Sequence, residues 1–215
     1  MKTTYLALMY ALGLLSSALP ALAEVKSLQV ALFSPIQITA PEHSITGLRL
    51  DLLYGINVNV TGLDLGLFNR TTGDEVGLQG GVVGIVRGTA TGFQSGLFTV
   101  ASQLTGIQGG VASVAGDAEG AQFGLIAISG AATGLQCGAF DISGDMHGIQ
   151  LGALNITGNL NGLQIGFANV SGYVERLQLG LLNVTGEING LQIGLINIIE
   201  RGGWFPVLPI VNGRR

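Results

Sequence analysis

Charged side chains are scarce in this chain: Asp, Glu, Lys and Arg make up only 10% of its 215 residues, against an average of about 25%. Its nine basic residues are scattered and its net charge is −4, so it lacks the basic stripe typical of nucleic-acid binding. No run of about 18 apolar residues follows residue 23, so we expect no transmembrane helix. Hydrophobic residues still make up 47%, which favours β-structure that packs on itself, on a partner or in lipid.

Residues that could carry chemistry are equally few. Cys137 is the only cysteine and occupies a repeat position that is otherwise mostly aliphatic, which indicates a small buried hydrophobe. It lies near Asp141, Asp145 and His147 in the sequence, but a Cys–His nucleophile needs its base within hydrogen-bond reach. The expected pairing partner of Cys137 is Leu151 rather than His147. No residue set specifies a reaction, a cofactor or a metal, and we expect a protein that is not an enzyme.

The first 23 residues have the three parts of a secretory signal peptide. Lys2 supplies the positive start, the stretch from Tyr5 to Leu19 is the apolar core, and Ala21-Leu22-Ala23 is a small-residue cleavage site before Glu24. We therefore expect an exported chain that begins at Glu24.

A unit of 14 residues recurs from Gly92 to Gly190, and looser 15-residue copies begin at Gly47, Gly62 and Gly77. A fixed period indicates one supersecondary unit whose copies cover their neighbours' apolar faces. The expected organisation is a signal peptide (1–23), an N-terminal strand and loop (24–46), eleven β-repeats (47–199) and a closing segment (200–215). The regular copies begin with Gly-x-Gln or a close variant, at Gly106, Gly120, Gly134, Gly148, Gly162, Arg176 and Gly190.

Each copy has the period of a β-strand. Numbered from its first residue, a copy has apolar side chains at positions 2, 4 and 6, as in Leu163, Ile165 and Phe167. They alternate with Gly, Gln and Gly, and a two-residue period is typical of strands. Positions 10 to 12 are Ser or Thr, Gly and a polar residue, which predicts a turn.

Two all-β folds could use such a strand. A near-mirror symmetry of residue class around position 4 suits antiparallel neighbours, with position 2 of one copy opposite position 6 of another. It favours a closed, shallow, up-and-down antiparallel barrel or ring of about a dozen short strands, since closure removes unpaired edges. The alternative is a β-solenoid with parallel stacking; such a coil needs two or three corners, and only one strong turn per copy is evident.

Glutamine recurs at position 3 of nearly every copy. We expect these side chains to bond their neighbours around the ring, and direct ligand binding is the alternative role. The positions are Gln108, Gln122, Gln136, Gln150, Gln164, Gln178 and Gln192.

The copies GIQLGALN (148–155) and GLQIGLIN (190–197), with the ending WFPVLPIVN (204–212), resemble a family of bacterial surface repeat proteins rich in GLQIGL-x-N units. That family's function is unknown. Proteins with similar repeats are described as shallow symmetric barrels called β-flowers. The resemblance spans residues 46–212, is weaker between Gly77 and Ala115, and implies no catalytic residue.

Export and low charge together lead to a functional expectation. We expect a secreted, non-enzymatic bacterial β-repeat protein in or on the outer membrane or cell surface, with a structural or binding role toward lipid or other surface components. The alternatives are an outer-membrane pore or channel, since eleven-residue stretches are long enough to span, and a soluble periplasmic binding protein. The apolar ending from Trp204 is expected to close the repeat array, or else to anchor it at an interface.

Overall fold

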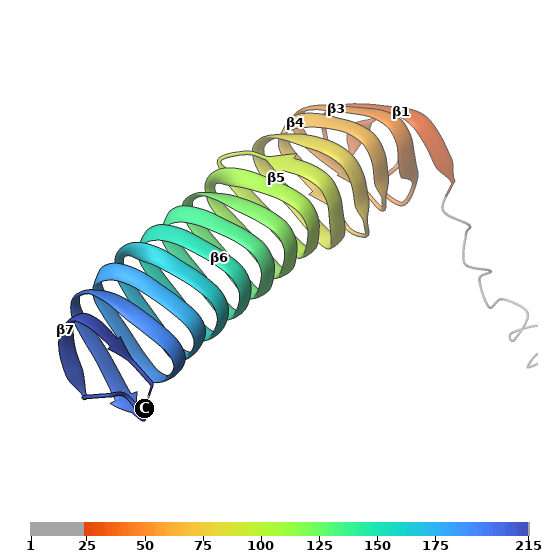
Figure 1. Cartoon of the computed structure of the whole chain (residues 1–215). Coiled ribbons are helices and arrows are strands. Elements are labelled where there is room, and N and C mark those ends of the chain that lie inside the picture. Colours follow the sequence, from red (N-terminus) through yellow and green to blue (C-terminus); the bar gives the residue numbers. More distant parts are fainter. Residues whose placement is uncertain (1–23, 215) are drawn as a thin grey trace, which may run out of the picture.

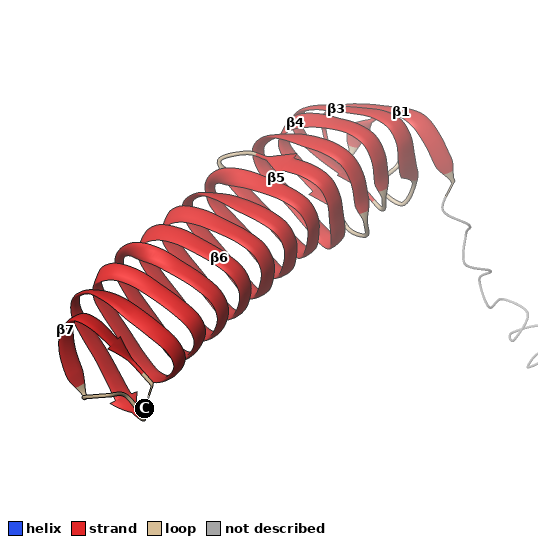
Figure 2. Ribbon diagram, viewed as in Figure 1, coloured by secondary structure: helices blue, strands red, loops and turns tan. Residues whose placement is uncertain are grey.

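The computed structural model describes residues 24–214, which form one elongated β-solenoid (Figure 1). The chain winds around a single axis, with β1 near one end and β7 at the other. The described residues contain strands and turns but no helix (Figure 2), so the expected all-β class is confirmed. The predicted signal peptide lies outside the described residues. The strands are β1 (Val25–Phe33), β2 (Ile36–Gln37), β3 (Ser44–Asn57), β4 (Val60–Thr71), β5 (Glu75–Ser95), β6 (Phe98–Arg201) and β7 (Val207–Gly213).

Successive copies stack in parallel and in register. Gly47 of β3 pairs with Gly62 of β4, which pairs with Gly77 of β5, and Gln94 of β5 pairs with Gln108 of β6. The closed antiparallel ring, with position 2 opposite position 6, is therefore wrong, and the solenoid is the fold. The physical reason is that parallel stacking places each position on its own equivalent, so that identical polar side chains can hydrogen-bond along the axis.

Glycine makes the corners that the sequence analysis did not find. In the copy that begins at Gly148, the buried side chains are those at positions 3, 8, 10 and 13, so the strict in-out alternation breaks twice, between positions 3 and 8 and between positions 10 and 13. A glycine lies within each break, at positions 5 and 11, and a third glycine stands at position 1. At Gly148, φ is +141° and an added Cβ would lie 2.0 Å from the carbonyl oxygen of Gly134. Only glycine fits such a position without strain.

The interior of the coil is mostly polar, and the apolar positions 2, 4 and 6 face outward. Phe167 and Leu195, both at position 6, are each 65% exposed. The expectation that neighbouring copies cover these side chains is wrong, because each copy lies above the next rather than against its outer surface. The apolar core is one narrow column at positions 10 and 13, which includes Leu104, Met146, Leu160, Val174, Ile188 and Ile199.

Each end of the solenoid carries a short antiparallel strand. At the N-terminal end, β2 pairs with β1 through Gln37 and Ile36. At the C-terminal end, β7 pairs with the last copy, where Asn212 lies opposite Gln192. The expected closing segment, 200–215, thus includes the strand that covers the last coil.

Candidate binding surface and interior ladders

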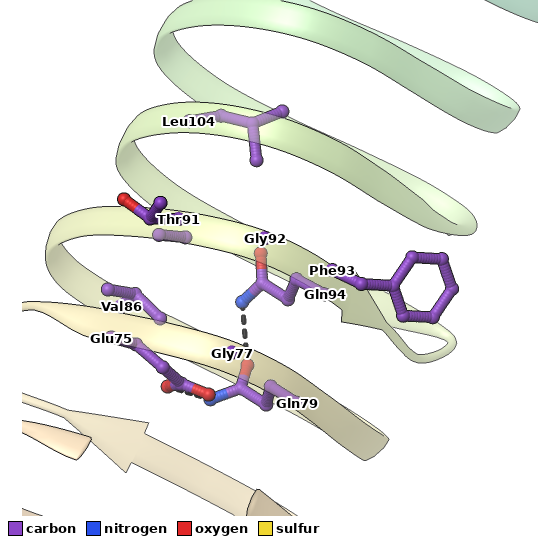
Figure 3. Close-up of a pocket in the computed structure, with 10 residues that line it drawn as sticks. Glu75, Gly77, Gln79, Val86, Thr91, Gly92, Phe93, Gln94 and Leu104 are labelled. Carbon is purple, nitrogen blue, oxygen red and sulfur yellow. Dashed lines mark hydrogen bonds between the residues drawn. The ribbon is translucent and has the colours of Figure 1, made fainter. Parts of the chain in front are cut away.

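The glutamines predicted from the repeat form a continuous ladder inside the coil. Each side-chain amide nitrogen donates to the amide oxygen of the glutamine one copy earlier, over 2.7 to 2.9 Å. Figure 3 shows the bond from Gln94 to Gln79 inside the coil, whereas Phe93 points away from it. All seven predicted glutamines are at most 1% exposed. A ligand could reach these amides only if the coil opened.

Second hydrogen bonds hold the glutamines across the coil. The amide nitrogen of Gln108 also donates to the carbonyl of Val114 at 3.2 Å, and that of Gln136 to the hydroxyl of Ser129 at 3.0 Å. These glutamines thus connect two sides of the coil as well as two copies. This arrangement favours a structural role for the glutamines, in which they stabilise the coil.

A second ladder, which the sequence analysis did not predict, runs through position 8. Asn155 donates to Asn169, Asn169 to Asn183 and Asn183 to Asn197, each over 2.8 Å. Its donors point toward the C-terminal end, whereas those of the glutamine ladder point toward the N-terminal end. The recurring Asn of the repeat was the available signal.

The cluster around Cys137 is not brought together as a catalytic site. Asp141 is fully buried, whereas Asp145 and His147 are exposed and Cys137 is half-buried. Leu151 occupies the same position as Cys137 one copy later. Burial raises the pKa of Asp141 to about 6, although a hydrogen bond from the backbone N–H of Gly138 opposes the shift. Within residues 24–214, no group of three or more His, Cys, Asp and Glu side chains is placed to hold a metal.

Charged side chains replace the glutamines in the first copies. Arg49, at position 3, is fully buried and makes a two-pronged ion pair with Asp64, at the same position one copy later, over 2.6 and 2.5 Å. Asp51 lies 3.3 Å from the Arg49 guanidinium. The sequence signal for this ion pair was an Arg and an Asp at equivalent positions of consecutive copies. The first copies match the repeat loosely, which made their register hard to recognise.

Glu75 lies beside this ion pair and holds a proton at neutral pH. Burial and the nearby Asp64 carboxylate raise the pKa of Glu75 to about 8, against partial compensation from Arg49. One carboxyl oxygen accepts hydrogen bonds from the Thr71 hydroxyl at 2.9 Å and from the Gln79 amide at 2.5 Å. Because a buried second anion beside Asp64 is costly, the neutral acid is the stable form.

The outer surface of the repeats separates into two regions. The apolar face consists of the outward side chains at positions 2, 4, 6, 7 and 9. Within residues 47–199, all of which the structure describes, only Arg70 is a charged outward side chain at positions 2 to 9. The most exposed members are Leu52, Leu78, Leu97, Phe98, Leu125, Phe167, Leu181 and Leu195.

The charged edge occupies the remaining outward positions, from 10 through 14 and 1. Acidic side chains dominate it, and the only basic ones between residues 47 and 201 are arginines. It contains Asp74, Asp117, Glu119, Asp145, Glu175, Glu187, Glu200, Arg87, Arg176 and Arg201. A surface divided in this way is amphipathic along its whole length.

The apolar face is large for a soluble monomer. Eleven copies spaced about 4.8 Å apart extend about 50 Å, and positions 2 to 9 follow about 25 Å of chain around the corner at position 5, so the area of this bent face is on the order of 1,000 Å². The largest apolar patch on a typical monomer is about 300 to 600 Å², and larger ones mark interaction sites. A hollow on this face is lined by Val30, Leu50, Leu52, Leu65 and Leu67.

No family model, curated protein or solved structure matches this chain. The candidate site therefore depends on its own geometry. Among the described residues, none belongs to a helix long and apolar enough to cross a membrane.

Proposed function

We propose that this chain is an exported, non-enzymatic bacterial β-repeat protein that lies on the outer membrane, with its apolar face against lipid and its charged edge in water. The observation that carries this proposal is the separation of charge on the outer surface. Between positions 2 and 9 only Arg70 is charged and outward, whereas the charged edge holds nearly all other outward charges of the repeats. The predicted signal peptide supplies the export step.

The energetics support a lipid partner. Burial of apolar surface contributes about 25 cal/mol per Å², so a face on the order of 1,000 Å² would supply about 25 kcal/mol before the costs of association. Even a small part of that contact is enough for stable binding. Such a surface is costly to leave in water.

The backbone arrangement also suits contact with hydrocarbon. Unpaired peptide groups are expensive in lipid. In the solenoid, the strands of successive copies pair with one another, as in the register from Gly62 to Gly66 on Gly77 to Gly81. The apolar face therefore presents mainly side chains.

The net negative charge of the charged edge indicates which lipids this protein would bind. Seven carboxylates and three arginines lie on that edge between residues 47 and 201. Anionic membrane surfaces attract clusters of Lys and Arg, which this edge lacks. We therefore expect binding to zwitterionic lipid, with no gain from anionic lipid.

A pore is the rival function. The interior positions of the coil hold side chains that hydrogen-bond or pack on one another, as Gln150 does with Gln136 at 2.8 Å. A filled interior favours surface binding over conduction. Single-channel recording in planar bilayers separates the two, because a pore gives discrete conductance steps and a surface-bound solenoid gives none.

Vesicle flotation tests the proposal. The exported chain should float with phosphatidylcholine vesicles. The variants Phe167→Asp and Leu195→Asp should each bind at least tenfold more weakly, because each places a carboxylate on the apolar face where the native side chain is 65% exposed and a buried charge is costly. Thr91→Asp adds the same charge on the exposed charged edge and should bind like the parent chain.

Two outcomes would contradict the proposal. One is a parent chain that stays at the bottom of the gradient with folded far-ultraviolet circular dichroism. The other is equal loss of flotation in all three variants. Either result would leave the soluble periplasmic alternative.

A further inference from the structure

A surface hollow lies where the apolar face meets the charged edge. It extends over three consecutive copies at positions 14, 1 and 2. Position 2 contributes Ile149, Leu163 and Leu177, and position 1 contributes Arg176 and the glycines of the two copies before it. Ile149 is 40% exposed, and the two leucines are half-buried. The hollow therefore has apolar side chains on one side and an arginine on the other.

Arg176 has a backbone conformation that belongs to glycine in the other copies. Its φ is +117°, and nine other copies have glycine with positive φ at position 1. A residue with a side chain is strained in this region. Strain of this kind persists mainly at functional sites, where the side chain has a use that offsets its cost to the fold. The conformation of Arg176 therefore indicates a role for its side chain.

The geometry of position 1 directs this side chain along the solenoid axis. A Cβ added to Gly162 would lie 1.9 Å from the carbonyl oxygen of Gly148, the residue at position 1 one copy earlier. By the same geometry, the side chain of Arg176 leaves the backbone toward Gly162 and Gly148, which both line the hollow. The long aliphatic part of an arginine can cover apolar surface while its guanidinium stays in water.

The guanidinium of Arg176 is free to bind a ligand. The residue is exposed, and within residues 24–214 it forms no ion pair. The neighbouring carboxylate of Glu175 instead accepts a hydrogen bond from the amide of Asn161 at 2.9 Å. All five N–H donors of the guanidinium can therefore face a ligand in the hollow.

From these observations we propose that the hollow at Arg176 binds the phosphate of a phospholipid headgroup. A planar guanidinium can donate two parallel hydrogen bonds to a phosphate, while Ile149 and Leu163 contact the apolar part of the same lipid. The hollow lies at the border of the apolar face, which is the depth of the phosphate layer when that face contacts hydrocarbon. This proposal rests on the proposed lipid binding and adds the headgroup chemistry. Phosphatidylcholine carries this phosphate without a net charge.

Two kinds of vesicle with no net charge test the proposal. Phosphatidylcholine has a phosphate, and digalactosyldiacylglycerol with the same acyl chains has none. In flotation titrations, the full exported chain should bind phosphatidylcholine about fivefold more tightly, the size expected for one charge pair at a surface. Arg176→Gln keeps a side chain at position 1 but removes the guanidinium, and it should bind both vesicles equally. Arg176→Lys keeps a positive charge and should retain part of the preference.

Two further variants separate headgroup binding from a loss of structure. Arg87→Gln makes the same change at an exposed position of the charged edge that does not line the hollow, and it should keep the preference of the parent chain. Arg176→Gly should lose the preference although its fold is relieved of strain. A loss of the preference in every one of these variants would overturn the proposal, because the arginine at the hollow would then have no special role.

The outcomes also separate this proposal from lipid binding itself. Equal binding of the two vesicles by the parent chain overturns the phosphate site and leaves lipid binding in place. An undiminished preference in Arg176→Gln does the same. A folded parent chain that binds neither vesicle overturns both proposals.

Discussion

Asp141 lies directly before Asn155 in the asparagine ladder, and the side-chain oxygen of Asn155 receives no hydrogen bond. The two side chains converge near Gly152, where a Cβ would lie 2.7 Å from the Asn155 oxygen and 2.9 Å from an Asp141 oxygen. An ionised carboxylate cannot donate. The asparagine ladder therefore stops between Asp141 and Asn155, because Asp141 has a carboxylate oxygen where the later copies have a donating amide nitrogen.

Asp141→Asn should stabilise the protein. The new amide group can donate to Asn155 as Asn155 donates to Asn169, and a hydrogen bond gained in the interior contributes about 1 kcal/mol. Urea denaturation at pH 7 measures the effect. The gain should shrink toward pH 4, because burial raises the pKa of Asp141 from 3.8 to about 6 and the protonated acid can itself donate. Asn155→Asp, which extends the break by one copy because it also removes the donor to Asn169, should destabilise. Equal stability of all three chains would contradict this role.

Glu75→Gln should remove much of the loss of stability that occurs as pH rises from about 4.5 to 8. The folded chain holds the Glu75 proton up to about pH 8, whereas the unfolded chain releases it near pH 4.5. Stability contributed by this site therefore falls as pH rises from about 4.5 to 8, at about 1.4 kcal/mol per pKa unit of difference. Thermal unfolding from pH 4 to 9 should show a weaker decline in Glu75→Gln than in the parent chain. The exposed Glu119→Gln is the control, and it should keep the decline of the parent.

Arg176→Gly should stabilise the coil. Arg176 occupies position 1 with φ of +117°, where nine other copies have glycine at positive φ. A side chain in this region costs about 1 to 3 kcal/mol, and the free energy of unfolding in guanidinium should rise by part of that amount. Gly162→Ala is the reverse change, and it should destabilise strongly because its Cβ would lie 1.9 Å from the Gly148 carbonyl oxygen. If both substitutions leave stability unchanged, the corner does not require glycine.

Gln150→Leu should destabilise by several kcal/mol. The substitution leaves the Gln136 oxygen without its donor and the Gln164 nitrogen without its acceptor. Each buried unpaired group costs about 1 to 3 kcal/mol. Gln103→Leu makes the same chemical change on the exposed surface, and its effect should stay within about 0.5 kcal/mol. A comparable loss from both substitutions would show that the ladder adds nothing.

The repeat alone predicts strands, their length and the recurrence of Gln at position 3, because these depend on local spacing. It does not predict which face is buried. The antiparallel ring depends on the near-mirror symmetry around position 4, in which Leu163 and Phe167 are similar and could pair across strands. They are alike because both face outward.

The sequence alone did not predict the buried charged cluster, for a different reason. Arg49 and Asp64 lie 15 residues apart, in copies whose sequences match the repeat loosely. Glu75 lies two residues before the next copy begins, at position 14 of a 15-residue copy, where the shorter later copies have Leu160 or Ile188. Only the register of the stacked coils brings these side chains together, and that register follows from parallel pairing.

The opposed directions of the Gln and Asn ladders bear on how this molecule could change in size. The amide dipoles of one column offset those of the other wherever both are present, so an inserted 14-residue unit adds little net dipole. Length can then vary by whole units, by duplication or by deliberate engineering, without electrostatic strain building up along the rod. The length of the solenoid is then set by the number of repeat units.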